Sequence, residues 1–253
     1  MYTYFKNSIH AMFNEEIMMK EKIRFNLNKV ARFFAFSMLL FVVGQQKIHA
    51  EVWGKVDFGP AYVHVDVLNF NRTVKRMDLI AYKADATVIV KDGWCIKPSI
   101  LYGANQGDLF TASIGVGHCF PIFEKLIVTP VVGFGYSFMR TTFKMPFQGY
   151  KLIFKERFRS YSPYMGLEAT YRIRPNLRVC GQVQYWWSRT RTTIKHLLKN
   201  KDHTSGPSYA AMLEYDLCET VSVNVGAAYN RSLSKEKHGI RGYGAKAGLA
   251  YWF

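Results

Sequence analysis

The sequence predicts an all-β protein: an antiparallel, up-and-down transmembrane β-barrel of about ten strands, with eight strands as the main alternative. Three observations predict it. Segments with period-two alternation of apolar residues recur along the chain, the gaps between them alternate in length, and the final segment has one apolar face. Side chains of a strand point alternately to its two faces, so a barrel wall reads as alternating lipid-facing and lumen-facing residues.

The N-terminal part of the chain has the features of a secretory signal peptide. Lys29 and Arg32 precede the apolar run 33–44, and Ala50 provides a small residue for cleavage. This run is too short to span a bilayer as a helix. We therefore expect residues 1–50 to be an N-terminal extension and signal peptide that is removed, and residues 51–253 to form a single barrel domain.

Ten segments of the remaining chain have the alternation of a strand, and each is long enough to cross a bilayer as a tilted strand of about 9 to 11 residues. An even number is typical of bacterial single-chain barrels. The first segment contains Gly59-Pro60, where a bulge could exchange its two faces. The segments are 52–66, 79–90, 94–104, 109–120, 125–138, 160–173, 177–187, 207–217, 220–230 and 243–253.

The gaps between these segments give an independent indication. After the odd-numbered segments the gaps 67–78, 139–159, 188–206 and 231–242 are long and only 105–108 is short, whereas the gaps after the even-numbered segments are all very short, as in 218–219. Barrels of this kind have long loops outside and short turns inside. Aromatic residues gather at both predicted ends, which is typical of the interfacial belts of membrane proteins. The predicted outer belt is Tyr62, Tyr102, Phe110, Tyr136, Phe138, Tyr161, Tyr185, Trp187, Tyr209, Tyr229 and Tyr243.

The last segment places Tyr243, Leu249, Tyr251 and Phe253 on one face, and its opposite face is mostly small or polar. On this segment alone, an edge strand of a soluble β-sandwich is an equal alternative. The terminal Tyr251 and Phe253 resemble the C-terminal assembly signal of bacterial outer-membrane β-barrels, here of the small opacity-like and porin-like class. The resemblance implies delivery to the barrel assembly machinery and a place in the outer membrane of a Gram-negative cell.

Residues 51–253 contain 27 Lys and Arg against 15 Asp and Glu, and the predicted outer loops hold all of this positive excess. A clustered positive field attracts anionic partners. We expect lipopolysaccharide or other outer-membrane lipid, or anionic host glycans, as partners; simple neutralisation of the cell's own outer leaflet is an equal alternative. Nothing indicates nucleic-acid binding. The candidate anion-binding residues are Arg140, Lys144, Lys151, Lys155, Arg157, Arg159, Arg189, Arg191, Lys195, Lys199 and Lys201.

The charges predicted to face the lumen nearly balance, so they can pair with one another. Because a barrel of about eight strands is filled by its own side chains, we expect a plugged or very narrow lumen. The favoured function is then an adhesin-like or structural surface barrel, and the alternative is a narrow porin-like diffusion channel. These charges are Lys55, Lys83, Lys97, Arg172, Arg178 and Lys246 against Asp57, Asp85, Glu168, Glu214 and Asp216.

Four cysteines, Cys95, Cys119, Cys180 and Cys218, fall near the predicted periplasmic rim. That compartment is oxidising, so disulfides are expected. Cys95 could pair with Cys119, and Cys180 with Cys218, although four cysteines allow three pairings. Free thiols or bridges to other proteins are the alternatives.

We expect no enzyme, no cofactor and no metal site. Ten strands is also the number in the omptin surface proteases, which need an acidic pair and a His-Asp pair at the outer rim. The nearest candidates here are His64 with Asp66 and Asp202 with His203, and no second pair of carboxylates faces them. A hydrolase reading of Ser232, Ser234, Glu236 and His238 is equally weak, because solvated polar residues are ordinary in a loop.

Overall fold

A computed structural model describes residues 52–105, 107–147, 150–194 and 198–253. The signal peptide and N-terminal extension expected at 1–50 lie outside the described residues. The described strands are β1 (Trp53–Asn69), β2 (Arg72–Ile89), β3 (Trp94–Asn105), β4 (Gly107–His118), β5 (Phe120–Phe123), β6 (Leu126–Phe147), β7 (Tyr150–Arg174), β8 (Leu177–Ile194), β9 (Leu198–Asp216), β10 (Val221–Leu233) and β11 (Gly239–Trp252), with a short 3-10 turn, η1 (Lys91–Gly93), before β3.

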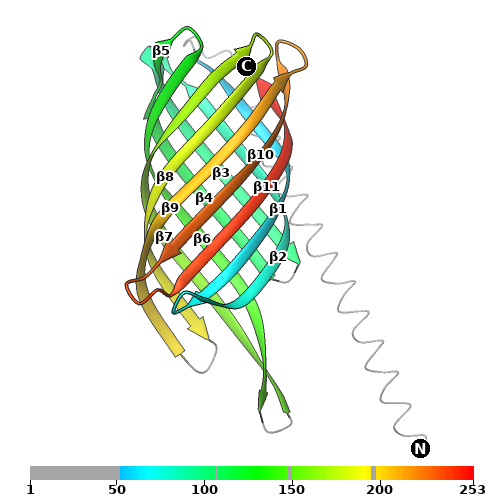
Figure 1. Ribbon diagram of the computed structural model, residues 1–253, viewed down its shortest axis with the longest axis vertical. Coiled ribbons are helices and arrows are strands. Elements are labelled where there is room, and N and C mark those ends of the chain that lie inside the picture. The colour runs from blue at the N-terminus through cyan, green and yellow to red at the C-terminus, as the bar shows by residue number, and fades with distance from the viewer. Residues whose placement is uncertain (1–51, 106, 148–149, 195–197) are drawn as a thin grey trace, which may run out of the picture. The chain divides into compact units, whose positions relative to one another are not determined.

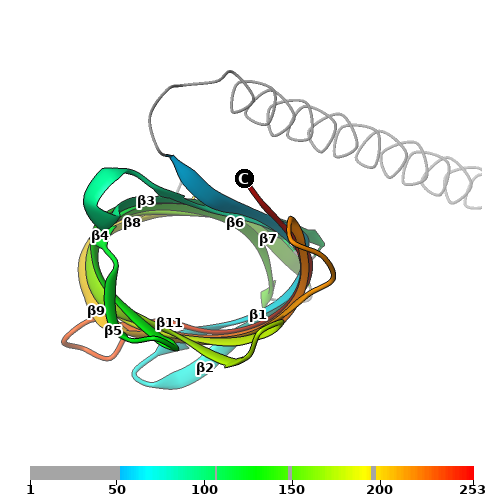
Figure 2. The same ribbon diagram turned by 90° about the horizontal axis from the view of Figure 1, so that it is seen from above.

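The strands form one closed antiparallel sheet (Figures 1 and 2). Apart from β4 and β5, strands that are consecutive in the sequence pair with each other, and in addition β1 pairs with β11 and β4 with β6. β5 continues β4 after an interruption at Cys119 and also pairs with β6. β4 and β5 therefore count as one strand of the barrel wall. The protein is therefore a closed ten-strand barrel, as predicted, and the alternative of eight strands is wrong.

The predicted segments correspond to the strands, with 109–120 spanning β4, the interruption at Cys119 and the start of β5, but the predicted long outer gaps are largely strand as well. β6 and β7 pair through the whole of 139–159 up to Phe147 and Tyr150, and β8 and β9 pair through most of 188–206. Expecting loops there was wrong, because threonines and aromatic residues continue the strand pattern beyond the membrane. In Figure 1 the β6–β7 hairpin consequently projects past the other strands at the lower end, here called the outer end.

The two faces of the wall differ as the alternation predicts. Val132 and Leu249 are each 59% exposed on the outward face, whereas Glu214 on the inward face is 1% exposed. Aromatic rings of the outer belt touch across strands: the centroids of Tyr136 and Tyr161 are 5.2 Å apart, as are those of Tyr229 and Tyr243, and Tyr209 stacks on Tyr229. An apolar wall between aromatic belts is the outer surface of a membrane-spanning barrel. No helix among the described residues is long and apolar enough to cross a membrane.

Inside, side chains narrow the lumen. Tyr164 and Trp186 stack with their ring centroids 4.2 Å apart. They lie over Gly133 and Gly135, where an added Cβ would come within 2.7 Å of a ring carbon. Near the outer end the inward face is apolar instead: Val65, Met77 and Met139 are buried against one another, with Val63, Val67, Leu109, Phe158 and Ile240 packed around them.

Candidate functional site

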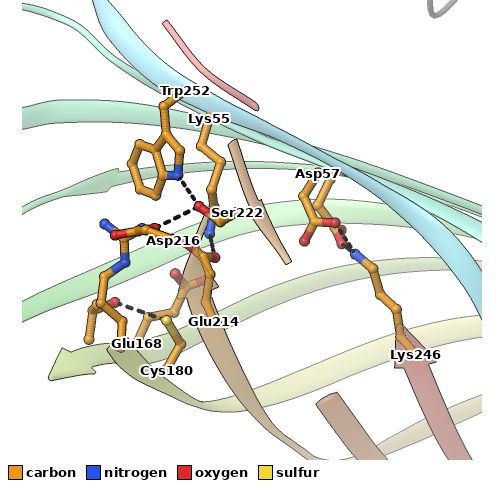
Figure 3. A network of polar contacts seen from close by, with 12 residues as sticks. Lys55, Asp57, Glu168, Cys180, Glu214, Asp216, Ser222, Lys246 and Trp252 are labelled. Carbon is orange, nitrogen blue, oxygen red and sulfur yellow. Dashed lines mark hydrogen bonds and ion pairs between the residues drawn. The ribbon is translucent and has the colours of Figure 1, made fainter. Parts of the chain in front are cut away.

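The lumen contains a network of buried charges contributed by strands distant in sequence (Figure 3). The carboxylate of Glu214 on β9 forms ion pairs with Lys55 on β1 at 2.5 Å and with Arg178 on β8 at 2.8 Å. Arg178 also contacts Asp216 and lies over the ring of Trp252 at 4.3 Å. Each charge is thus compensated inside the wall, which is what burial of ions requires.

Two further groups complete the pattern. Lys246 pairs with Asp57 at 2.8 Å and with Asp85 at 3.0 Å, and Lys97 of β3 pairs with Glu168 of β7. Every charge predicted to face the lumen has an ion-pair partner among the described residues except Arg172. A cavity of about 1340 Å³ nevertheless remains, with a lining that extends from the inner end to the outer end of the barrel. The pairing that the sequence predicted is therefore present, although the lumen is not filled.

The outward face of the outer end carries a second cluster of charge, which we call the arginine face: Arg157 and Arg159 on β7, and Arg189 and Arg191 on β8, all exposed. Residues two apart on a strand share a face. The register places Arg159 opposite Arg191, and Tyr161 of the aromatic belt opposite Arg189. Arg140 on β6 and Lys201 on β9 extend the cluster, because they lie opposite Arg157 and Arg191.

Carboxylates are nearly absent from this face. Between residues 139 and 206 the sequence contains only Glu156, Glu168 and Asp202. All three lie at positions of the alternation that face inward, opposite in parity to the arginines. Asp108, at 3.8 Å from Arg140, is the one described carboxylate that pairs with a member of the extended cluster. Like charges opposite each other destabilise a sheet, so the arginine face holds an uncompensated repulsion.

The arginine face is also hollowed. A depression of about 220 Å³ is lined by Arg157, Arg159, Arg191 and Thr193. Below it, Arg159 and Arg140 lie 5.9 Å and 5.5 Å from the ring centroid of Phe138, close enough for cation–π contact. Guanidinium groups bind phosphate or sulfate oxygens through paired N–H donors. Three of them around one depression form a site suited to such an anion.

The opposite side of the barrel differs at the same height. There Asp66 accepts hydrogen bonds from Arg241 at 2.7 and 3.1 Å, and His64 lies 2.7 Å from Asp78. Burial raises the pKa of Asp66, but the hydrogen bond and charge of Arg241 outweigh this and hold the pKa below its usual value. A hydrogen bond from Tyr62 lowers the pKa of Asp78 in the same way. On this side carboxylates therefore pair with Arg241 and His64, whereas no described carboxylate pairs with the four residues of the arginine face.

The sequence-predicted anion-binding residues are thus only partly brought together. Arg140, Arg157, Arg159, Arg189, Arg191 and Lys201 share one face. Lys144, Lys151, Lys155 and Lys199 lie on the outer extensions of β6, β7 and β9, and their side chains are not among those described, while Lys195 lies outside the described residues. The sequence contained the signal that separates them, because the arginines on each strand are two residues apart.

The candidates for catalysis are not arranged as the omptin chemistry requires. His64 and Asp66 point outward, and Asp66 is occupied by Arg241. Asp202 and His203 are adjacent on a strand and so point to opposite faces, joined only through the His203 backbone N–H at 2.7 Å. Ser234 accepts a bond from the backbone, not the ring, of His238.

All four cysteines are free thiols in the structure. Cys95 and Cys119 lie close together near the inner end, because Cys95 pairs with Gly117 across β3 and β4 and the backbone N–H of Cys119 bonds to Gly93 just before β3. Cys180 and Cys218 are not brought together: Cys180 lies opposite Met212 and contacts Thr170, whereas Cys218 lies beyond the end of β9 and contacts Thr220.

Oxidation of the purified protein is therefore expected to link Cys95 to Cys119 and to leave Cys180 and Cys218 as thiols. Disulfides persist in an oxidising compartment when two thiols are close enough to join. Peptide mapping of non-reduced, alkylated protein would detect the cross-linked peptide. Alkylation of Cys95 and Cys119 after exposure to oxidant would contradict the expectation, and a Cys180→Ser variant should give the same map as the natural chain.

No protein-family model and no curated protein sequence matches the chain. Solved structures do match it. The outer-membrane protease OmpT of Escherichia coli aligns with a TM-score of 0.54 at 13% identity, over 80% of this chain and 96% of that one. The attachment invasion locus protein Ail of Yersinia pestis, in complex with the heparin analogue sucrose octasulfate, aligns with a TM-score of 0.43 at 11% identity, over 80% and 99%. The shared feature is the fold, which is that of bacterial outer-membrane β-barrels.

Proposed function

We propose that the protein is an outer-membrane surface barrel that binds phosphate- or sulfate-bearing molecules through its outer arginine face, with a lumen too constricted to conduct. One observation carries this proposal: the lumen charges other than Arg172 are paired, whereas Arg157, Arg159, Arg189 and Arg191 have no carboxylate partner among the described residues. Unpaired charge on an exposed face acts on partners, because paired charges cancel at a distance.

An enzymatic role receives less support. Activation of water needs a base within hydrogen-bond reach of a reacting group in a cleft. Among the described histidines, His64 lies nearest to carboxylates, and it is engaged with Asp78 and Asp66 on the outward wall. We therefore propose that the barrel has no hydrolytic activity, although its fold is shared with a protease.

A narrow diffusion channel is the second candidate, and the lumen cavity of about 1340 Å³ is the observation that favours it. Against it stand the ion pairs and the apolar cluster of Val65, Met77 and Met139 at the outer end. Hydrophobic constrictions close pores by excluding water.

Planar-bilayer recording separates these two candidates. Residues 51–253, refolded and shown by a heat-dependent gel shift to be closed barrels, are expected to insert without discrete conductance steps. Steps of constant size would overturn the closed-lumen proposal and make the channel the leading function. In the same preparation, phosphatidylcholine vesicles containing the barrel are expected to bind immobilised heparin, and to lose that binding as salt rises, since exposed charges are screened. Absence of binding at low salt would contradict the anion-binding proposal.

A further inference from the structure

We infer that the arginine face binds the phosphate groups of a phosphorylated glycolipid in the barrel's own leaflet, with the depression between Arg157, Arg159 and Arg191 as the phosphate site. This inference rests on the proposed anion-binding function and adds to it the ligand and its direction of approach. The ligand lies beside the barrel in the membrane rather than arriving from outside.

The arginine face lies at the level of the lipid headgroups. On the outward face of β7 the order from the outer end is Arg157, Arg159, Tyr161, Pro163 and Met165. Alternate residues on a strand are roughly 6–7 Å apart. Tyrosines of the aromatic belt lie at the level of the lipid headgroups, so the guanidinium groups one and two steps above Tyr161 lie at the level of headgroup phosphates.

The arginine face is continuous with the apolar wall of the barrel. Arg157 and Arg159 have the same outward parity as Met165, which is 52% exposed on the apolar wall. A molecule that fills the depression therefore approaches from the side, and its acyl chains can lie along Phe134, Met165 and Leu167, all exposed on neighbouring positions of β6 and β7. A soluble anion would make only the upper half of these contacts.

The arginine face places like charges opposite each other on neighbouring strands. Arg159 lies directly opposite Arg191, and Arg140 directly opposite Arg157. Such like-charged pairs are unfavourable in an empty site, and bidentate arginine–phosphate contacts would offset the repulsion. Two phosphates fit this arrangement better than one: the depression accepts the first, and Arg189, two residues from Arg191 on the same face, is placed for the second.

The test is native mass spectrometry of the full-length barrel extracted from membranes in mild detergent. The natural protein is expected to retain a bisphosphorylated glycolipid at about one per barrel. An R157Q/R159Q/R191Q variant is expected to retain at least tenfold less glycolipid per barrel, since it loses charge-assisted hydrogen bonds, which are stronger than neutral ones. An R157K/R159K/R191K variant should lie between, because lysine keeps the charge without the bidentate geometry.

The matched control is R72Q/K235Q/K237Q, which removes the same charge from exposed positions of the β1–β2 and β10–β11 hairpins. It should retain the lipid. Equal loss in both variants, with the heat-dependent gel shift intact, would overturn the inference by showing that only total charge matters. Equal retention in both would overturn it by showing that the lipid binds elsewhere.

A second measurement distinguishes this inference from the proposed function. Barrels in phosphatidylcholine nanodiscs, with or without added lipid A, are titrated with a soluble heparin fragment. Added lipid A is expected to weaken heparin binding at least tenfold by occupying the arginine face. An affinity for heparin that is the same with and without lipid A would overturn the lipid inference and leave the proposed function intact. No binding of either ligand would overturn both.

Discussion

Replacing Ile114 with arginine is expected to destabilise the membrane-inserted barrel by about 2–4 kcal/mol, the cost of a cationic side chain on the lipid face at the bilayer midplane. Ile114 is 54% exposed on the outward face of β4, with Phe110 four residues away toward the outer end and His118 four residues away toward the inner end. The position is therefore midway between the two aromatic belts. Urea unfolding of the barrel in lipid vesicles measures the change.

Val74 provides the matched control. It is 56% exposed, also on a strand, but on the β1–β2 hairpin beyond the outer belt. The same substitution there should change the free energy of unfolding by less than about 0.5 kcal/mol, as for most surface substitutions. Equal effects at the two positions would mean that the apolar wall does not lie in lipid, and would undermine the outer-membrane assignment.

The second large effect is expected inside the barrel, at Glu214. Glu214→Gln removes the carboxylate that pairs with Lys55 at 2.5 Å and with Arg178 at 2.8 Å. Breaking a buried ion pair by removing one partner costs about 3–5 kcal/mol, because the other charge stays buried without compensation. Arg178 keeps Asp216, so most of the loss should come from Lys55.

A double-mutant cycle with Lys55→Met tests this assignment by urea unfolding. If Lys55 carries the loss, the double variant should be more stable than Glu214→Gln alone. Glu219→Gln, at an exposed turn position, is the control and should leave stability unchanged. A loss of under about 1 kcal/mol for Glu214→Gln would show that water in the lumen solvates these charges, and would favour the channel.

The wall of the barrel was predictable because each strand repeats one simple rule. Lipid and lumen impose opposite demands on alternate positions, so the parity of Val132 or Leu249 was readable without knowing any contact. The same rule assigned Lys55, Glu214 and Lys246 to the lumen, where the structure places them. Individual partners were not predictable, because Lys55 reaches a strand that is distant in sequence.

The outer region was predicted less well, for a related reason. A loop was inferred wherever the lipid-facing pattern ended, yet the backbone ladder of β6 and β7 continues to Phe147 and Tyr150 in water. Counting charge by loop then merged residues on different faces. Parity applied to Arg157, Arg159, Arg189 and Arg191 would have identified the arginine face from the sequence, because these residues alternate with inward-facing neighbours such as Phe158.

The seam of the barrel has a consequence for how the molecule is made. β1 and β11 join residue 55 to residue 252, and the backbones of Gly54 and Phe253 exchange two hydrogen bonds at 2.9 and 3.0 Å. Contacts between such distant parts of a chain form slowly. Until the last strand has been synthesised and delivered, both sheet edges present unsatisfied backbone groups that invite pairing with other chains. We therefore expect the β1–β11 seam to close last during folding, and the open sheet edges to need protection from other chains until then.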